Sequence, residues 1–324
     1  MWFNTTIGTD IAEAKRFLEQ GETVGIPTET VYGLAANALS PEAVLKIFSV
    51  KNRPHFDPLI VHVSSANEIE KYTENIPQKA EELMRAFMPG PLTLLLPKKS
   101  VIPDLVTSGL DTVAVRVPKH KLTLELLQQL DFPLAAPSAN PFGYISPTSA
   151  YHVYDQLHGR IPYILDGGTT EVGLESTIVG FENDHAVVYR LGGLSVDDIE
   201  RITGKAILQL NESSNPKSPG MLKSHYAPKK NLTIRQFNEL NIDEIQAENA
   251  GAILFNQYIQ NSPSPNQILL SAKGDVKEAA RNLFAAMRQL DNSNVSVIYT
   301  IPFPDTGLGK AINDRLRRAA VGTE

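Results

Sequence analysis

The chain has 324 residues, enough for two domains, and its 42% hydrophobic and 20% charged residues are typical of a globular protein in water. It contains no cysteine, which excludes disulfides, cysteine nucleophiles and thiolate metal sites. The net charge of -6 argues against a generally basic surface for nucleic acids, but it is compatible with a local cationic cleft. No apolar run is long enough to cross a bilayer and no secretory signal begins the chain, so we expect a cytoplasmic protein without membrane contacts.

The first two thirds of the chain alternates helical patterns with short apolar strands. The periodicity predicts helices at 10–20, from Ser40 to about Val50, and at 77–87, 120–130 and 148–158. It predicts strands at 23–27, 59–63, 92–96, 112–117, 133–136, 163–165, 177–179 and 186–189. Eight short strands mixed with helices favour a twisted α/β sheet, whose topology the spacing does not give.

The composition changes near residue 210, where a polar stretch rich in turn formers begins. Beyond it we expect a smaller α/β unit with strands at 252–255 and 295–299, an amphipathic helix at 275–290 and a basic helix at 308–320. The sequence therefore predicts a large α/β domain over 1–207, a linker over 208–230 and a small C-terminal domain over 231–324.

Two cations stand in a stiff loop where a helical pattern ends. Lys51 and Arg53 lie two residues apart, and Pro54 and Pro58 prevent the helix from continuing. An Arg fork beside a Lys point charge is a common arrangement for phosphate oxygens. The alternative is a solvated loop with two surface cations.

The strand at 112–117 alternates strictly between two faces. Its three valines belong to the core, so Thr112 and Arg116 project from the opposite face. A buried mid-strand Arg needs an anionic partner, and either a substrate carboxylate or an internal Glu would serve.

Several loops are rich in hydroxyl groups. Thr28 and Thr30 follow a strand, while Ser146 and Thr148 stand where a helix N-terminus would present free N–H groups to an anion. Simple turn formation and helix capping are the alternatives. The sequence has neither a Walker phosphate loop nor a His pair at metal-ligand spacing.

Together these motifs resemble the YrdC-type family. The resemblance rests on Thr-Glu-Thr-Val-Tyr-Gly-Leu at 28–34, Lys-x-Arg-Pro at 51–54, Pro-Ser-Ala-Asn at 137–140 and Glu-Ser-Thr-Ile at 175–178. Ser-Pro-Gly-Met at 218–221 and His-Tyr-Ala-Pro at 225–228, followed by the small C-terminal unit, resemble the long, two-domain form of the threonylcarbamoyl-AMP synthase family.

The resemblance implies a YrdC-like mixed sheet with a concave cationic pocket, plus a small open-sheet α/β domain. It implies a nucleotidyltransferase that makes L-threonylcarbamoyladenylate and pyrophosphate from L-threonine, bicarbonate and ATP, with Mg²⁺ accompanying ATP. A separate transferase complex would then modify an adenosine beside the anticodon of tRNA, and weak direct binding of RNA is a further expectation.

The resemblance also implies two sets of site residues. Those expected to hold L-threonine are Thr30, His62, Arg116, Ala136 and Ser176, with Arg116 taking the carboxylate. Those expected around ATP are Lys51, Arg53, Asp57, Thr112, Ser138, Asn140, Ser146, Arg190 and Tyr226. Catalysis is expected from Lys51, Arg53 and Arg116, without a metal ion held by the protein alone. Asp57 and Phe142 depart from the family pattern, which has Asn and a small polar residue at these positions.

We expect residues 218–228 to fold over the pocket as a lid that excludes water, with a passive tether as the alternative. The basic helix end at 314–318 is interpreted as a solvated or packing face. Two other functions stay open at this point: a non-catalytic RNA-binding module, and a carbamoyltransferase related to hydrogenase-maturation proteins.

Overall fold

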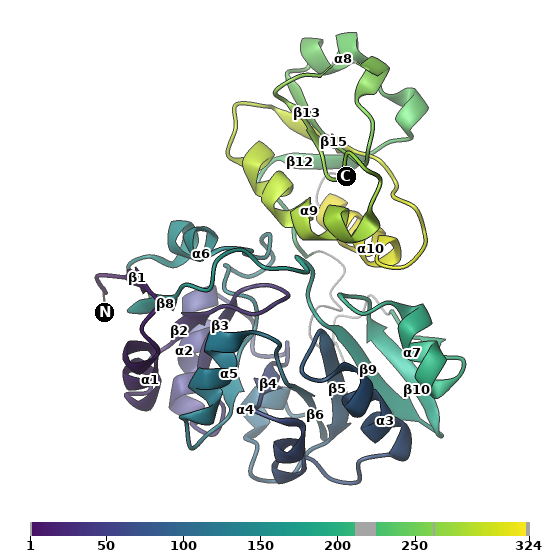
Figure 1. Ribbon diagram of the computed structural model, residues 1–324. Helices are drawn as coiled ribbons and strands as arrows, with labels where there is room; N and C mark the ends of the chain where they lie inside the picture. The colour runs from purple at the N-terminus through teal and green to yellow at the C-terminus, as the bar shows by residue number, and fades with distance from the viewer. Residues whose placement is uncertain (1, 211–224, 262, 322–324) are drawn as a thin grey trace.

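The computed structural model describes residues 2–210, 225–261 and 263–321, which form two α/β parts stacked one on the other (Figure 1). The larger part is built on a sheet with the strand order β1-β8-β2-β3-β7-β4-β6-β5-β9-β10-β11. Its strands are β1 (Thr6–Gly8), β2 (Val24–Ile26), β3 (Gly33–Asn37), β4 (Ile60–His62), β5 (Leu92–Pro97), β6 (Thr112–Arg116), β7 (Leu134–Ala135), β8 (Tyr163–Leu165), β9 (Thr177–Glu182), β10 (His185–Arg190) and β11 (Ile207–Leu208).

Both parallel and antiparallel pairs occur in this sheet, which confirms the predicted mixed α/β fold. For example, β4 runs parallel to β6 with His62 opposite Arg116, whereas β4 and β7 are antiparallel. The first register places His62 and Arg116 side by side at the same ends of their strands. The valines of β6 lie in the core, as the alternation predicts.

All of the predicted helices of this part are present. Its helices are α1 (Ile11–Glu19), α2 (Pro41–Lys51), α3 (Gln78–Phe87), α4 (Asp104–Thr107), α5 (Lys121–Gln128), α6 (Ala150–Leu157) and α7 (Val196–Thr203), with a 3₁₀ turn at Ala66–Lys71. Helix α2 begins where predicted, because the Ser40 hydroxyl accepts a hydrogen bond from the N–H of Ala43.

The prediction omitted α4, α7, β1, β3 and β11. Helix α4 is a single turn and β11 has two exposed residues, so neither gives a periodic signal. Strand β3, with the sequence Gly-Leu-Ala-Ala-Asn, lacks the β-branched residues and the alternation that identify a strand.

The C-terminal part is a small, open, fully parallel sheet with the order β12-β15-β13-β14. Its elements are β12 (Asn231–Ile234), α8 (Ile242–Ala247), β13 (Ala250–Leu254), β14 (Gln267–Leu269), α9 (Val276–Asp291), β15 (Val297–Thr300) and α10 (Gly309–Ala320), with 3₁₀ turns at Phe237–Glu239 and Ile259–Asn261. The predicted strands and both predicted helices are present, while β12, β14 and α8 were not predicted.

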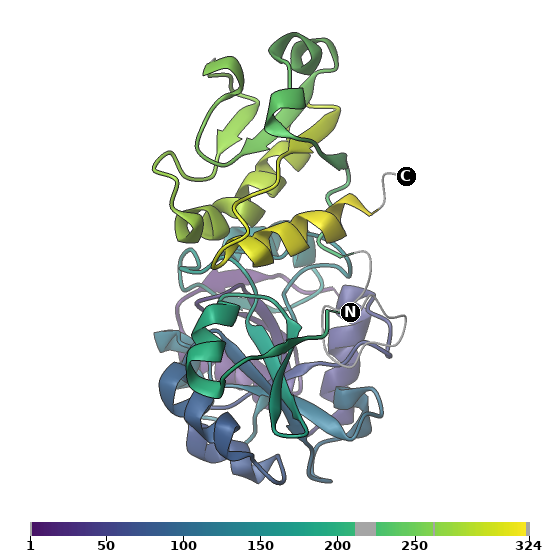
Figure 2. The same cartoon turned by 90° about the vertical axis from the view of Figure 1, so that its right-hand side faces the viewer.

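Helices α9 and α10 lie between the C-terminal sheet and the large part (Figures 1 and 2). Polar side chains tie the two parts together: the Tyr144 hydroxyl donates to Asp291, and the Arg288 guanidinium donates to the carbonyl of Ile145. None of the helices in the described ranges is both long and apolar enough to cross a membrane.

Candidate active site

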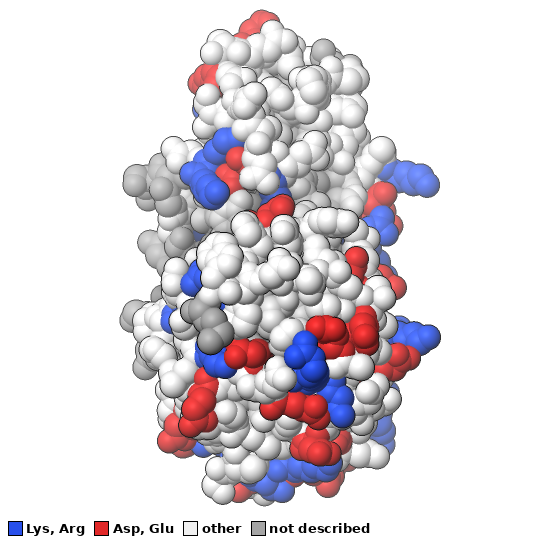
Figure 3. Space-filling view, turned by 90° about the vertical axis from the view of Figure 1, so that its left-hand side faces the viewer, with Lys and Arg blue, Asp and Glu red and all other residues white. Residues whose placement is uncertain are grey.

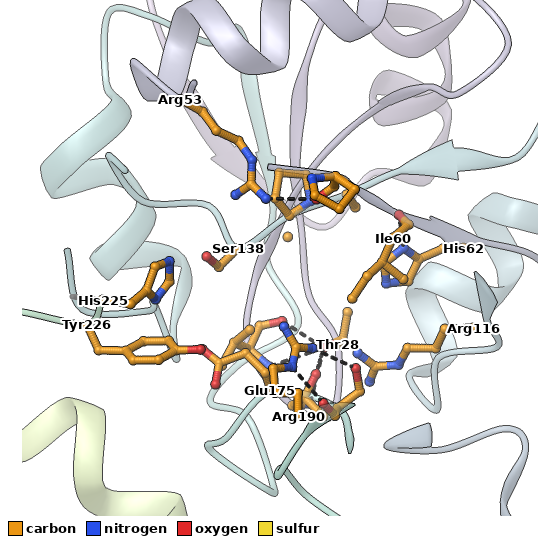
Figure 4. Close-up of a pocket in the computed structure, with 17 residues that line it drawn as sticks. Thr28, Arg53, Ile60, His62, Arg116, Ser138, Glu175, Arg190, His225 and Tyr226 are labelled. Carbon is orange, nitrogen blue, oxygen red and sulfur yellow. Dashed lines mark hydrogen bonds between the residues drawn. The ribbon is translucent and has the colours of Figure 1, made fainter. Parts of the chain in front are cut away.

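A pocket opens where several strand ends of the large sheet meet the described end of the linker. It is lined by Thr28, Thr30, Val31, Gly33, Arg53, Pro58, Ile60, His62, Arg116, Ala136, Pro137, Ser138, Glu175, Ser176, Arg190, His225 and Tyr226. In Figure 4, Arg116 and His62 stand at one end, while Arg53, Ser138, His225 and Tyr226 stand at the other. We call these the Arg116 end and the Arg53 end.

Arg116 provides the positive charge of the first end. Its Nη2 donates to Glu29 Oε1 at 2.7 Å, and its Nε donates to the carbonyl of Gly90 at 3.3 Å. Both members of the ion pair are almost completely buried. Of the two partners that the sequence left open for Arg116, the structure therefore shows the internal Glu. Arg116 Nη1 makes no hydrogen bond to any residue within the described ranges, and the guanidinium points toward the pocket (Figure 4).

His62 is a neutral neighbour of this cation. Burial, reinforced by the positive charge of Arg116, lowers the pKa of His62 to about 3. Its Nδ1 lies 3.2 Å from the carbonyl of Ile60 and donates to it. The imidazole therefore offers a neutral polar surface near pH 7, and the charge at this end comes from Arg116.

Arg53 provides the charge of the second end, together with a carboxylate. Its Nη2 lies 2.9 Å from Asp57 Oδ2, and the same guanidinium donates to the carbonyls of Asp57 and Pro58. Burial raises the pKa of Asp57, and the nearby cations, led by Arg53, oppose that rise. The negative charge of Asp57, which stands where the family pattern has Asn, is thus balanced by the Arg53 guanidinium.

Lys51 lies behind the Arg53 end and does not line the pocket. Its ammonium donates to the backbone carbonyls of Ser138 and Asn140, and the Asn140 side chain donates to the carbonyls of Pro141 and Tyr144. Burial, and then repulsion by Arg53, lower the pKa of Lys51 well below its usual range. Through these hydrogen bonds, Lys51 and Asn140 hold the loop that carries Ser138.

Arg190 and Ser176 connect the two ends. Arg190 Nη2 donates to the Ser176 hydroxyl at 3.1 Å, and its Nε donates to the Ser176 carbonyl at 3.0 Å. The neighbouring Glu175 accepts a hydrogen bond from the hydroxyl of Ser146. Gly192 allows this close packing, since a Cβ at this position would lie 2.3 Å from the carbonyl oxygen of Glu175.

His225 and Tyr226 close the pocket from the linker side. Tyr226 has a φ of 65°, a left-handed conformation that is uncommon outside glycine, and its side chain extends to the pocket (Figure 4). The N–H of Ala227 donates to the carbonyl of Gly143 and fixes this segment on the site loop. The remaining cavity is about 50 Å³, well below the roughly 300–1,000 Å³ of typical ligand pockets.

The unusual Phe142 faces this same segment. Its ring meets the His225 ring edge-on, with centroids 6.1 Å apart, and the Arg53 guanidinium lies 5.9 Å from its centre. Phe142 thus packs beside the closing residues. Residues 218–224 of the expected lid lie outside the described residues.

The structure brings most of the expected site residues to one pocket. Those that line it are Thr30, Arg53, His62, Arg116, Ala136, Ser138, Ser176, Arg190 and Tyr226. Lys51, Asp57, Asn140 and Ser146 are buried close behind it. Thr112 begins β6, four residues before Arg116, and is not among the lining residues, so its role as an ATP contact stays a prediction.

The sequence motifs suggested Glu29 as a substrate ligand or a turn cap, and they gave Glu175 and His225 no role. The structure pairs Glu29 with Arg116 and places Glu175 and His225 in the lining. The sequence did contain a signal for these carboxylates. Arginines lie on strands predicted to be buried, and each buried arginine needs an anionic partner. For the basic end of α10 the sequence left a solvated face or a packing face open, and the structure shows packing at Arg315, which is fully buried and pairs with Glu175 at 2.9 Å.

Among the described residues, several buried polar atoms lack a hydrogen-bond partner, and those of Asn140, His225 and Tyr226 lie near the Arg53 end. Asp57 Oδ1 also lacks a partner, whereas Asp57 Oδ2 is paired with Arg53. Unpartnered buried polar groups are costly and mark places that a polar ligand or water satisfies. Within the described ranges, no three His, Asp or Glu side chains gather closely enough to hold a metal ion.

Comparisons with known proteins agree on one family. Residues 16–192 match the family described as "Telomere recombination", and residues 194–321 match "Threonylcarbamoyl-AMP synthase, C-terminal domain". The chain is 40% identical to the threonylcarbamoyl-AMP synthase of Pyrococcus abyssi, over 95% of this chain and 93% of the relative. It is also 40% identical to that of Bacillus subtilis, over 98% and 95%.

A solved structure leads to the same family. The crystal structure of P. abyssi Sua5 complexed with L-threonine has 37% sequence identity and a TM-score of 0.89, covering 99% of this chain and 98% of that one. The two-domain fold expected from the sequence is thereby confirmed.

Proposed function

This chain belongs to the threonylcarbamoyl-AMP synthase family, and we propose that it forms threonylcarbamoyl-AMP and pyrophosphate from L-threonine, bicarbonate and ATP as a nucleotidyltransferase. The observation that carries the proposal is the single pocket with two cationic ends. A threonine carboxylate suits the unused donor of Arg116, and phosphate oxygens suit Arg53 and Arg190.

The Arg116 end would hold L-threonine. Its carboxylate would bind Arg116, while Thr30 and Ser176 offer hydroxyl groups to the amine and side chain of the substrate. Neutral His62 adds no second positive charge that would repel the amine. Ala136 leaves room beside them.

The Arg53 end would hold ATP. Negative charge develops on the α-phosphate and on the leaving pyrophosphate, and fixed guanidinium groups stabilise it in a site from which water is excluded. Lys51, Asp57, Asn140 and Ser146 would act mainly by fixing the loops around ATP, since their side chains already bind protein groups or lie behind the lining.

The pocket would then promote the reaction chiefly by holding the threonine amine, bicarbonate and the α-phosphate of ATP in reacting positions. The threonine amine adds to carbon dioxide derived from bicarbonate and loses a proton, giving a carbamate. A carbamate oxygen attacks the α-phosphorus, and the bond to the pyrophosphate oxygen breaks. No single side chain of the pocket has to serve as an indispensable general base.

Mg²⁺ would arrive with ATP. Magnesium is usually held by one or two carboxylates together with substrate phosphates, and both oxygens of Glu175, the carboxylate that lines the pocket, already accept hydrogen bonds from Ser146 and Arg315. The residues present therefore fit a metal held mostly by ATP, whose charge it would neutralise.

The product would pass to a complex that modifies tRNA. The face shown in Figure 3 mixes acidic and basic side chains without a continuous basic area.

Pyrophosphate release from ATP, Mg²⁺ and bicarbonate, with and without L-threonine, tests the proposal. We expect release that requires both threonine and bicarbonate, and that Arg116→Gln abolishes. Arg85→Gln is the matched control, because Arg85 is an exposed helix residue with 71% of its side chain accessible. Folded protein that releases no pyrophosphate in a threonine-dependent way would overturn the proposal.

A further inference from the structure

The C-terminal domain places one fully buried arginine against the wall of the pocket. Arg315 lies on α10, and its side chain is 0% exposed. Its neighbour Arg317, two residues along the same helix, is exposed to solvent. An arginine is rarely buried without a specific set of acceptors, so the contacts of Arg315 indicate what it holds.

Each nitrogen of this guanidinium has a different partner. Nε donates to Glu175 Oε2 at 2.9 Å, Nη1 to Asp314 Oδ2 at 2.6 Å, and Nη2 to the carbonyl of Leu191 at 2.7 Å. The guanidinium carbon also lies 4.9 Å from the centre of the Tyr226 ring. One side chain of the C-terminal domain thus contacts three separate segments around the pocket.

These segments adjoin Ser146 and Arg190, which are expected around ATP, and include Tyr226 of the Arg53 end. Glu175 binds the Ser146 hydroxyl through its other oxygen, and Leu191 directly follows Arg190. Tyr226 closes the cavity, with Phe284 of α9 stacked on it at a centroid distance of 5.6 Å. By contrast, within the described part of the chain no C-terminal residue bonds to Thr30, His62 or Arg116.

A second arginine of the C-terminal domain acts on the same end. Arg288 of α9 donates to the backbone carbonyls of Ile145 and Ser146 and to the side chain of Gln156. The loop that carries Ser146 is therefore held from both α9 and α10. The domain braces one half of the pocket and leaves the other half to the large sheet.

We propose that Arg315 is a positioning residue for the nucleotide half of the site, acting through Glu175, Leu191 and Tyr226. The C-terminal domain is then a structural part of the ATP site. This inference rests on the proposed function in assigning ATP to the Arg53 end, and it predicts that the two substrates respond differently to changes in α10.

Calorimetric titration of the full chain with L-threonine alone and with ATP alone tests this. Arg315→Gln should weaken ATP binding by at least about tenfold, because it removes charge-assisted hydrogen bonds from a buried carboxylate. Affinity for L-threonine should stay within about twofold. Arg315→Lys keeps the charge but lacks the planar fork of hydrogen-bond donors. Its ATP affinity should therefore lie between those of the parent protein and Arg315→Gln. Arg317→Gln, on the exposed face of α10, is the matched control and should bind both substrates like the parent protein.

A double-mutant cycle shows whether Arg315 acts through Glu175. If it does, Arg315→Gln/Glu175→Gln should weaken ATP binding no more than the worse single variant, because the uncompensated carboxylate is gone. This double variant also replaces Arg315→Gln if that variant does not fold. Equal loss of both substrates in folded protein, or no loss of either, overturns the proposal. If the parent protein binds both substrates but makes no pyrophosphate, the proposed reaction fails while the binding comparison stands.

Discussion

At the scale of single residues, the pocket is surrounded by buried arginine–carboxylate pairs. Arg116 pairs with Glu29, Arg53 with Asp57, and Arg315 with Glu175. A buried ion pair contributes little net stability, but removing one partner leaves a costly unpaired charge. These pairs therefore fix where each guanidinium lies, which is what recognition of a carboxylate or phosphate requires.

Arg116 gives the first prediction. Replacing Arg116 by Gln in a Glu29→Gln background removes both charges, and it should weaken L-threonine binding by about 1.5–3 kcal/mol, the usual range for hydrogen bonds to charged groups. Glu29→Gln alone keeps the cation and is the matched control. Calorimetry with L-threonine measures the difference. Equal affinity in the two proteins would show that the substrate carboxylate binds elsewhere.

His62 gives a prediction about pH. Its pKa is lowered to about 3 in the folded protein, whereas an unfolded chain protonates His near pH 6.5. Between these values only the unfolded state takes up the proton, so stability falls as pH drops. The loss from this group should reach about 2 kcal/mol at pH 5.

Urea unfolding at pH 7.5 and pH 5.0 measures this contribution. His62→Gln should reduce the pH-dependent loss of stability by about 2 kcal/mol. His158→Gln, at an exposed position at the end of α6, should leave the loss unchanged. An unaltered loss in His62→Gln would mean that His62 is not held neutral.

At the scale of elements, the sequence predicted segments whose pattern is local. Helix α2 was predicted because Ser40 and Pro41 mark its start and apolar residues repeat along it. Strand β6 was predicted with its faces, because valines alternate with Arg116. Strand β3 was omitted because its pairing with β2 and β7, rather than its own residues, makes it a strand.

The candidate site likewise has parts that local sequence patterns predict and parts that depend on contacts between distant residues. Motifs identified the loops of the pocket, since hydroxyl groups, prolines and arginines cluster in them. Which carboxylate meets which arginine could not be predicted, because Glu29 and Arg116 lie 87 residues apart in sequence. Whether Arg315 faces solvent or packs inside the protein could not be decided from the sequence, because the burial of α10 depends on contacts with another domain.

The segment His225–Ala227 gives a prediction at this scale. Tyr226 is buried, its hydroxyl has no hydrogen-bond partner among the described residues, and burial raises its pKa to about 12, so the phenol stays neutral. If Tyr226 acts by covering the pocket, Tyr226→Phe should retain at least about half of the turnover, whereas Tyr226→Ala should lose about tenfold or more. Threonine-dependent pyrophosphate release measures both. Equal damage in the two variants would instead give the hydroxyl a direct role in the reaction.

At the scale of the whole molecule, the two α/β parts share a buried polar interface. Arg288 reaches the carbonyls of the site loop, Tyr144 donates to Asp291, and Arg315 reaches Glu175. If the C-terminal part unfolded alone, Ile145, Tyr144 and Glu175 of the large part would lose these partners. Such an intermediate is unfavourable, so the domains are coupled through the same contacts that brace the pocket.

This coupling predicts one calorimetric unfolding transition for the full chain. The double variant Arg288→Met/Arg315→Met should resolve two transitions, because it replaces the interdomain hydrogen bonds by apolar side chains that need no partner across the interface. The control is Arg281→Met/Arg317→Met, which changes exposed positions on the same two helices and should preserve a single transition. Two separate transitions in the parent protein would contradict the coupling. One transition in all three proteins would mean that apolar packing of α9 and α10 joins the domains without the arginines.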